Sequence, residues 1–265
     1  MDTILVTGGT GHLGRGVVGL LTAQGHRVRV LARRPGHDPN IEWVTGDLGT
    51  GAGVAGAVAG VDAIVHAATH SPAAQRGKLR LGDLIRAPSD VDIDGTRRLL
   101  AEANRAGVRH FLHISIVGVQ QSRIPYSRMK AAAENLVREG AVPWSIVAAT
   151  PFYWLLARML DNMARQRFWV LPSNVAVQLG DSADFAQYVV ECLGDGPRGR
   201  REDFGGPEIL TMVELARKYQ AARGISRRVV GIPLPGFALR AAGPQTCPHG
   251  RHGKTTWSEW LNSRR

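Results

Sequence analysis

Short apolar runs alternate with helical patterns along the first 150 residues of the chain. The run at 4–6, for example, is followed by leucines and valines at 13, 17, 18 and 21, the spacing of one helix face. The alternation continues and predicts strands at 4–6, 27–31, 41–44, 61–66, 110–114 and 144–147, and helices at 51–59 (weakly), 92–106 and 126–139. Strands separated by helices need crossover connections, so we expect an α/β fold with a parallel, doubly wound sheet.

The pattern is looser beyond Thr150. Helices are expected near 152–166, 182–193 and 211–223, and no clear linker precedes them. We therefore expect a dinucleotide-binding domain over 1–150, and a small substrate-binding region over 151–265 that packs on the same domain at the carboxyl edge of the sheet.

Composition excludes several classes of protein. The 265 residues are 44% hydrophobic and 21% charged, which is typical of a globular chain. No apolar run approaches the roughly 20 residues needed to cross a bilayer, so we expect no membrane partner. The N-terminus has no basic segment before its first strand, and Cys192 and Cys247 are the only cysteines. These features favour a cytoplasmic protein without disulfides.

The strong positive charge raises the question of a nucleic-acid partner. Lys and Arg number 33 against 22 Asp and Glu, a net charge of +11. Residues 1–150 hold 17 basic and 12 acidic side chains and residues 151–265 hold 16 and 10, so the excess is shared between the halves. A binding surface for nucleic acid would concentrate the excess, so we expect none.

A glycine-rich turn follows the first expected strand. Gly8, Gly11 and Gly14 stand between that strand and the next helix, where they allow a tight turn, close approach of a pyrophosphate and close helix packing. The free N–H groups of the helix N-terminus then face the phosphates. Thr10, Leu13 and His12 complete the predicted cofactor contact, although a solvated His12 is the alternative.

The end of the second strand bears on the choice of cofactor. Arg33 and Arg34 stand where enzymes that prefer NAD place an acidic residue, and an arginine suits a 2′-phosphate. We therefore expect NADP(H) rather than NAD(H); two solvated arginines are the alternative. Residues just after the next two strands are expected beside the adenine and along the cofactor, respectively Asp47 with Leu48 and Ala67 with Ala68.

Tyr126 and Lys130 lie four residues apart, on one face of an expected helix. A free phenol is a poor acid–base catalyst at neutral pH, and a neighbouring cation makes it a better one. The same ammonium can hold the cofactor ribose. Ser115 closes the fifth strand and is expected to bind a substrate carbonyl, so the predicted catalytic residues are Tyr126, Lys130 and Ser115.

These motifs together resemble the short-chain dehydrogenase/reductase superfamily, and more narrowly its atypical, NmrA-like branch. The resemblance covers 1–150 well, through Thr7–Gly14, Asp94–Leu100, His113–Gly118, Tyr126–Lys130 and Trp144–Thr150, and continues more loosely through Gly206–Thr211 and Trp257–Leu261. It implies a Rossmann fold, a nicotinamide cofactor and, in active members, a Ser-Tyr-Lys centre.

Two residues depart from the pattern of that family. Asp92 stands where extended members have an Asn, which leaves open whether it replaces that Asn in proton relay. Ile116 stands where a second Ser often follows the first. NmrA-like relatives that bind cofactor without turnover mostly lack the Tyr, which this chain retains.

The substrate pocket is expected above the nicotinamide. Ile116, Phe152 and Trp154 are its candidates, and five of the 16 aromatic residues fall between 152 and 169. They favour a bulky apolar substrate such as an aromatic polyketide or a quinone; packing of the C-terminal helices is the alternative. The basic loop 69–88 is either a lid or an exposed loop. Cys247, His249 and His252 match no common zinc pattern, so no metal is expected.

The favoured function is NADPH-dependent reduction of a ketone, or the reverse oxidation of an alcohol, in a monomer or homodimer. A cofactor-binding redox sensor without turnover is one alternative. An epimerase, dehydratase or quinone reductase on the same scaffold is the other.

Overall fold

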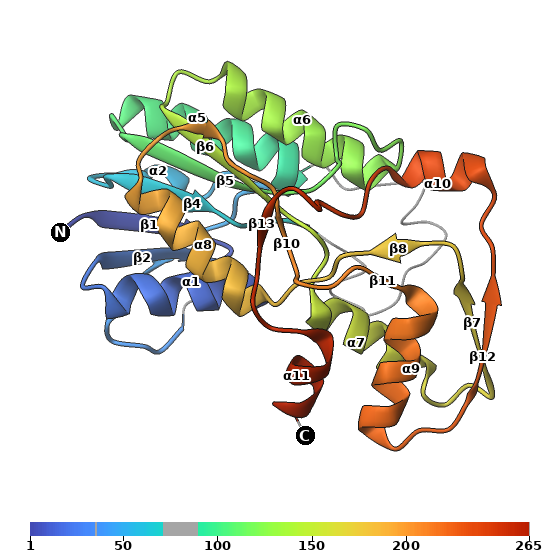
Figure 1. The fold of residues 1–265 in the computed structure, drawn as a ribbon. Helices are drawn as coiled ribbons and strands as arrows, with labels where there is room; N and C mark the ends of the chain where they lie inside the picture. The colour runs from blue at the N-terminus through green and yellow to red at the C-terminus, as the bar shows by residue number, and fades with distance from the viewer. Residues whose placement is uncertain (35, 71–89, 265) are drawn as a thin grey trace.

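A computed structural model describes residues 1–34, 36–70 and 90–264. Almost all of the basic loop 69–88, expected to be either a lid or an exposed loop, lies outside these residues. The chain forms a central parallel sheet with helices on both faces and a smaller C-terminal region beside it (Figure 1).

The six predicted strands of the first 150 residues form the middle of this sheet, in the order β3-β2-β1-β4-β5-β6. Every neighbouring pair among them is parallel. The order reverses between β1 and β4, and open sheets of this kind bind ligands at such a switch point, beyond the carboxyl ends of the strands. The strands are β1 (Thr3–Thr7), β2 (Arg27–Ala32), β3 (Ile41–Thr45), β4 (Ala63–His66), β5 (His110–Ile116) and β6 (Trp144–Ala149).

Helices cover the two faces of the sheet and enclose two cores. Alternate side chains of the strands point to opposite faces, so Leu112 packs with Val17 and Phe185 while Phe111 packs with Leu99 and Val137. The first face carries α1 (His12–Ala23) and α8 (Ser182–Gly194), and the second carries α2 (Val54–Val58), α5 (Thr96–Arg105) and α6 (Pro125–Glu139). The helix predicted over 92–106 begins as a π-helical turn, η1 (Asp90–Gly95), before α5.

The sheet continues past residue 150. β10 (Phe204–Gly205) pairs with β6, β13 (Arg251–His252) pairs with β10, and β9 (Gly199–Arg200) also pairs with β6. Because α8 packs on α1 as well, the segment after residue 150 supplies part of the nucleotide-binding fold, and the expected boundary is not a boundary of the sheet.

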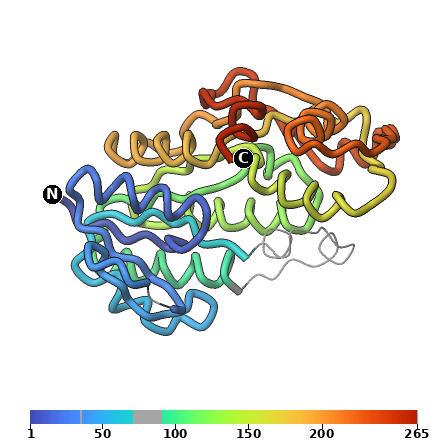
Figure 2. The backbone as a smooth tube through the Cα atoms, turned by 90° about the horizontal axis from the view of Figure 1, so that it is seen from below, coloured from blue at the N-terminus to red at the C-terminus, as the bar shows by residue number. Residues whose placement is uncertain are grey.

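The rest of the C-terminal region has a core of its own, in which Trp169 and Trp257 are fully buried. Figure 2 shows the red and deeper orange segments of this region along the upper side of the view, whereas the lighter orange helix α8 lies beside the blue helix α1. Its elements are α7 (Tyr153–Met163), β7 (Phe168–Pro172), β8 (Ala176–Val177), β11 (Leu210–Thr211), α9 (Met212–Arg223), β12 (Arg228–Ile232), α10 (Gly236–Ala242) and α11 (Trp257–Asn262).

Candidate active site

The glycine turn after β1 has no room for side chains at two of its positions. A Cβ at Gly8 would lie 2.7 Å from the backbone of Ala67 and Ala68, and Gly8 also has a positive φ of 75°. A Cβ at Gly14 would lie 2.1 Å from the carbonyl oxygen of Gly8. The turn therefore packs directly against both α1 and the segment after β4, which is the geometry that the sequence pattern predicts.

The start of α1 leaves its N–H groups open to an anion. The N-cap residue is Gly11, with no side-chain cap and no acidic residue in the first turn. Its own N–H donates to the Gly8 carbonyl at 2.9 Å, which closes the turn. These features fit the phosphates of a dinucleotide.

His12 opens α1 and stacks on Trp154 of α7, with ring centroids 4.2 Å apart and an angle of 14° between the planes. Burial, and then the charge of Arg15, lowers the pKa of His12. His12 is nevertheless exposed, so its contact with a cofactor and the solvated alternative both stay predictions. Trp154, predicted to line a substrate pocket, is half-buried and stacks on this residue beside the glycine turn.

The other predicted cofactor residues take varied positions. Arg33 and Arg34 are exposed after β2. Asp47 accepts the N–H of Gly49 at 2.7 Å, and the Leu48 side chain is buried in the core. Their contacts with a cofactor, and those of Thr10 and Leu13, stay predictions.

Tyr126 and Lys130 meet two residues that come from other elements. The Tyr126 hydroxyl lies 3.3 Å from Thr69 Oγ1, just past β4. Lys130 Nζ lies 3.5 Å from Asp92 Oδ1 and donates to the Ile114 carbonyl of β5 at 3.2 Å. Ala67 lies against Gly8, and Thr69 follows it by two residues, so these side chains lie near the glycine turn. We call Tyr126, Lys130, Thr69 and Asp92 the strand-end cluster.

Asp92 is the centre of the strand-end cluster. Its side chain is 1% exposed and that of Lys130 is 5% exposed, so their ion pair is shielded from water. Asp92 also accepts the Thr69 hydroxyl at Oδ1 and the His70 N–H at Oδ2, each at 2.8 Å. A buried carboxylate needs this many partners to stay charged.

Thr69 is a residue that the sequence did not single out. Its single hydroxyl proton goes to Asp92, so its oxygen is left to accept the proton of the Tyr126 hydroxyl. The only sequence signal for Thr69 was its place just past a strand end. Asp92 was noticed only as a departure from a family pattern.

Ser115 does not join Tyr126 and Lys130. Its side chain is buried, and its hydroxyl donates to Glu134 Oε1 at 2.5 Å, toward the middle of α6. Glu134 also holds Arg138 and Arg200. The prediction that Ser115 binds a substrate carbonyl is corrected here, because its proton is committed to a structural carboxylate. Ile116, the next residue, is half-buried at the end of β5.

His66 connects the glycine turn to Asp92. Its Nδ1 lies 2.7 Å from Thr7 Oγ1, and its Nε2 lies 2.9 Å from Thr96 Oγ1. Thr96 donates its proton to the Asp92 carbonyl, so His66 carries its proton on Nε2 and accepts from Thr7. Burial, and then the charge of Lys130, lowers the pKa of His66 to about 3, which keeps this link neutral.

The aromatic residues at 152–169 mostly pack the fold. Tyr153 and Trp169 are buried in the C-terminal core, and Phe152 packs against Phe185 of α8. This outcome supports the packing alternative and removes most of the argument for a flat aromatic substrate.

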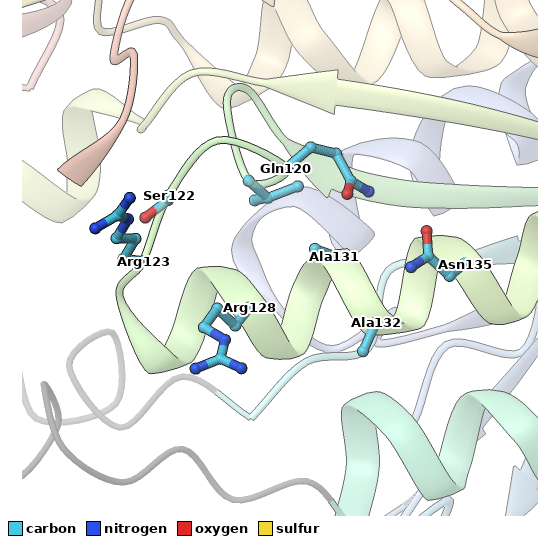
Figure 3. A pocket seen from close by; sticks show the side chains of 8 residues that line it. Gln120, Ser122, Arg123, Arg128, Ala131, Ala132 and Asn135 are labelled. Atoms are coloured by element: carbon cyan, nitrogen blue, oxygen red, sulfur yellow. The ribbon is translucent and has the colours of Figure 1, made fainter. Parts of the chain in front are cut away.

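A cavity of about 510 Å³ lies elsewhere, on the far side of α6 (Figure 3). Arg128, Ala131, Ala132 and Asn135 recur along one face of the helix, opposite Tyr126 and Lys130. The loop residues Val119, Gln120, Ser122 and Arg123 complete its lining.

Within residues 1–34, 36–70 and 90–264, no helix is long and apolar enough to span a membrane. In the same part of the chain, no group of three or more His, Cys, Asp and Glu side chains could hold a metal ion.

Comparison with known proteins places the chain among nicotinamide-binding proteins. A family described as NAD(P)H-binding matches residues 8–195. The (4-alkanoyl-5-oxo-2,5-dihydrofuran-3-yl)methyl phosphate reductase of Streptomyces griseus is 32% identical over 87% of this chain and 75% of its own. Photosystem II assembly factor Ycf39 of Trieres chinensis is 28% identical over 88% and 72%.

The fold has solved counterparts. A short-chain dehydrogenase/reductase superfamily protein from Agrobacterium tumefaciens, solved with bound NAD, superposes with a TM-score of 0.73 over 98% of this chain and 95% of its own. The two sequences are 22% identical, so this likeness shows the Rossmann fold alone.

Proposed function

The chain belongs to the NAD(P)H-binding family, and from this premise we propose that it is an NADPH-dependent reductase with Tyr126 as its proton donor. The observation that carries the proposal is the strand-end cluster, in which a Tyr and a buried Lys–Asp pair lie beside the glycine turn. The favoured reaction is reduction of a ketone, or the reverse oxidation of an alcohol.

The glycine turn and the α1 N-terminus would hold the cofactor phosphates, Arg33 and Arg34 a 2′-phosphate, and Lys130 the ribose. A nicotinamide cofactor, when bound, supplies the hydride. The protein then has to supply a proton to the oxygen of the substrate, and Tyr126 does so from its hydroxyl. The Tyr126 hydroxyl donates to Thr69 Oγ1 over 3.3 Å, which is a long hydrogen bond. The hydroxyl proton can therefore rotate toward a better acceptor, the substrate oxygen.

Asp92 and Thr69 act as positioning residues. Asp92 holds Lys130 and the Thr69 hydroxyl at one oxygen, which fixes both groups around Tyr126. Ser115 has no part in this proposal, because it is bonded to Glu134.

Replacing Tyr126 tests the proposal. Tyr126→Phe removes the proton and keeps the ring, so we expect turnover of a panel of ketones with NADPH to fall about 100-fold or more, while NADPH still binds. Ser115→Ala is the matched control and should keep turnover within a few fold. Unchanged turnover in Tyr126→Phe would remove Tyr126 from the reaction.

The same assay separates the alternatives. A wild-type protein that binds NADPH but oxidises it with no ketone or quinone would favour a redox sensor. The relative Ycf39 is named as an assembly factor, and for that reason we retain the redox sensor as the alternative function.

The preference for NADPH has its own test. Arg33→Ala should weaken NADPH binding about tenfold and leave NADH binding unchanged, as measured by fluorescence titration. Arg27→Ala, at the opposite end of the same strand, is the control. Equal affinities for the two cofactors in the wild type would remove the argument from Arg33 and Arg34.

A further inference from the structure

One face of the paired strands β7 and β12 exposes apolar side chains. In β7, Trp169 and Leu171 are buried in the C-terminal core, whereas Phe168 and Val170 are 49% and 54% exposed on the other face. Figure 1 shows the two strands at the outer edge of the C-terminal region, with α10 beyond them. No described element of the chain covers this face.

The strand register makes these side chains one continuous strip. Arg228 is paired with Phe168, Val230 with Val170 and Ile232 with Pro172, and paired residues of parallel strands point to the same face. Beyond the strands, the Asn174 side chain exchanges two hydrogen bonds with the backbone of Leu234, which extends the ribbon. Leu234 is 36% exposed and Phe237, in α10, is 70% exposed. We define the ribbon face as the outward strand residues Phe168, Val170, Val230 and Ile232 together with the exposed Leu234 and Phe237, which follow β12 in the sequence.

Arginines without acidic partners border the ribbon face. The stretches 162–180 and 215–258, which contain β7, β12 and α10, hold 10 Lys and Arg and no Asp or Glu. Arg165, Arg167, Arg227 and Arg228 are exposed at the end where both strands begin. None of these four forms an ion pair within the described residues, and Arg167 lies over the Phe168 ring, 5.7 Å from its centroid.

We propose that the ribbon face rests on an anionic lipid surface, with the apolar strip in the acyl boundary and the arginines at the phosphate groups. Aromatic and aliphatic side chains beside unpaired cations fit such a surface, because both the apolar contact and the charge attraction stabilise binding. No helix in the described part of the chain is long and apolar enough to span a bilayer, so the proposal is one of binding at the membrane surface.

The charge distribution argues against other occupants. Two copies of a chain with net charge +11 would repel one another if they met through arginine-rich ends. Apart from the arginine, the outward side chains along β7 and β12 are apolar, so this face has few groups that would select one acidic protein. A dimer is the alternative occupant that the test below can detect.

Vesicle sedimentation tests the proposal with full-length protein. We expect binding to vesicles of equal parts phosphatidylglycerol and phosphatidylcholine, little binding to pure phosphatidylcholine, and loss of binding in 0.5 M NaCl, where charge attraction is screened. Phe168→Ser with Phe237→Ser should weaken binding at least tenfold. Both side chains are exposed, and retained NADPH binding would show that this double variant is folded.

A matched pair of charge reversals separates a local site from bulk charge. Arg228→Glu changes the charge beside the ribbon face by two units. Each unit near the surface contributes about fivefold to binding, so vesicle binding should weaken on the order of 20-fold. Arg198→Glu makes the same change beside β9, which pairs with the amino-terminal half of β6, and should have little effect. Equal losses in the two variants, or no binding by the wild type, would overturn the proposal. So would a dimer, seen by sedimentation velocity, that Phe237→Ser dissociates.

Discussion

The strand-end cluster and the ribbon face treat their charged groups in opposite ways. In the cluster, Asp92 and Lys130 are buried together, and each has further hydrogen-bond partners inside the chain. On the ribbon face, arginines are exposed without acidic partners beside apolar side chains that nothing in the described chain covers. The charged groups of the strand-end cluster have their partners within the chain, and the site lacks only a ligand the size of a cofactor. The apolar side chains of the ribbon face, in contrast, would be covered only by an extended surface.

This difference separates two kinds of functional evidence. Buried polar groups are costly unless every one is paired, so a satisfied cluster at a strand edge indicates a site that is held rigid before any ligand arrives. An exposed apolar strip costs less in the folded monomer and indicates a surface that waits for a partner. Three substitutions should therefore destabilise the protein in a defined order, and acid should destabilise it through each of its buried histidines.

Removing Asp92 should have the largest effect. Asp92→Ala leaves the Lys130 ammonium buried without its counter-ion, so the free energy of unfolding should fall by about 3–5 kcal/mol in urea titrations. Asp94→Ala is the control on the same segment, because its ion pair with Arg97 is exposed, and it should change stability far less. Similar small effects from both would mean that the Asp92–Lys130 pair is not a buried pair in solution.

Adding one methyl group to the glycine turn should come next. Gly14→Ala forces a contact with the Gly8 carbonyl, and we expect about 2–3 kcal/mol of destabilisation together with loss of NADPH binding. Gly19→Ala lies in the same helix with open space around its Cβ, and should raise stability by about 0.5–1 kcal/mol. A tolerated Gly14→Ala would contradict the packing of α1 on the turn.

Acid should destabilise the protein through its buried histidines. Burial lowers the pKa of His66 to about 3, that of His110 to about 4, and that of His113 well below its ordinary value. The unfolded chain therefore binds protons first as pH falls below about 6.5, and the free energy of unfolding should decrease by up to about 1.4 kcal/mol per pH unit for each histidine.

Urea titrations at pH 7, 6 and 5 measure this slope. His113 has no hydrogen-bond partner at either ring nitrogen among the described residues. His113→Leu should therefore reduce the slope of the free energy of unfolding against pH by the contribution of one histidine. A slope equal to that of the wild type would mean that folding does not lower the pKa of His113.

The smallest effect is expected on the ribbon face. Phe237→Ser should change the free energy of unfolding by no more than about 0.5 kcal/mol and leave the affinity for NADPH unchanged, because the ring is 70% exposed. A loss comparable to that of Gly14→Ala would show that the ring is buried in solution and would erase the contrast between the two regions.

Local patterns were enough to predict the fold and half of the cluster. Apolar runs and helical spacing predicted the six central strands, and the positions of Gly8, Gly11 and Gly14 predicted the turn. Tyr126 and Lys130 were expected on one helix face because one helix turn separates them, and both belong to the strand-end cluster.

Contacts between residues on different strands could not be predicted from local patterns. Thr69 and Asp92 are 57 and 38 residues from Tyr126 and Lys130, respectively, and only the strand order brings them together. Ser115 was misplaced because adjacent side chains at a strand end point to opposite faces, and its face leads to Glu134. The stacking of Trp154 on His12 was not predicted either, because α7 brings together two residues that are far apart in the sequence.

The distribution of charge on the surface also could not be predicted from local patterns. Counted over two halves, the basic excess is even, and no membrane partner was expected because no apolar run is long enough to span. The parallel pairing of β7 with β12 brings two distant acid-free stretches together and aligns their outward side chains. By itself, the sequence determined each local element, because periodicity and turn chemistry act between near neighbours. Only the tertiary structure decided which side chains share a face, because strand register and order join residues that the chain keeps far apart.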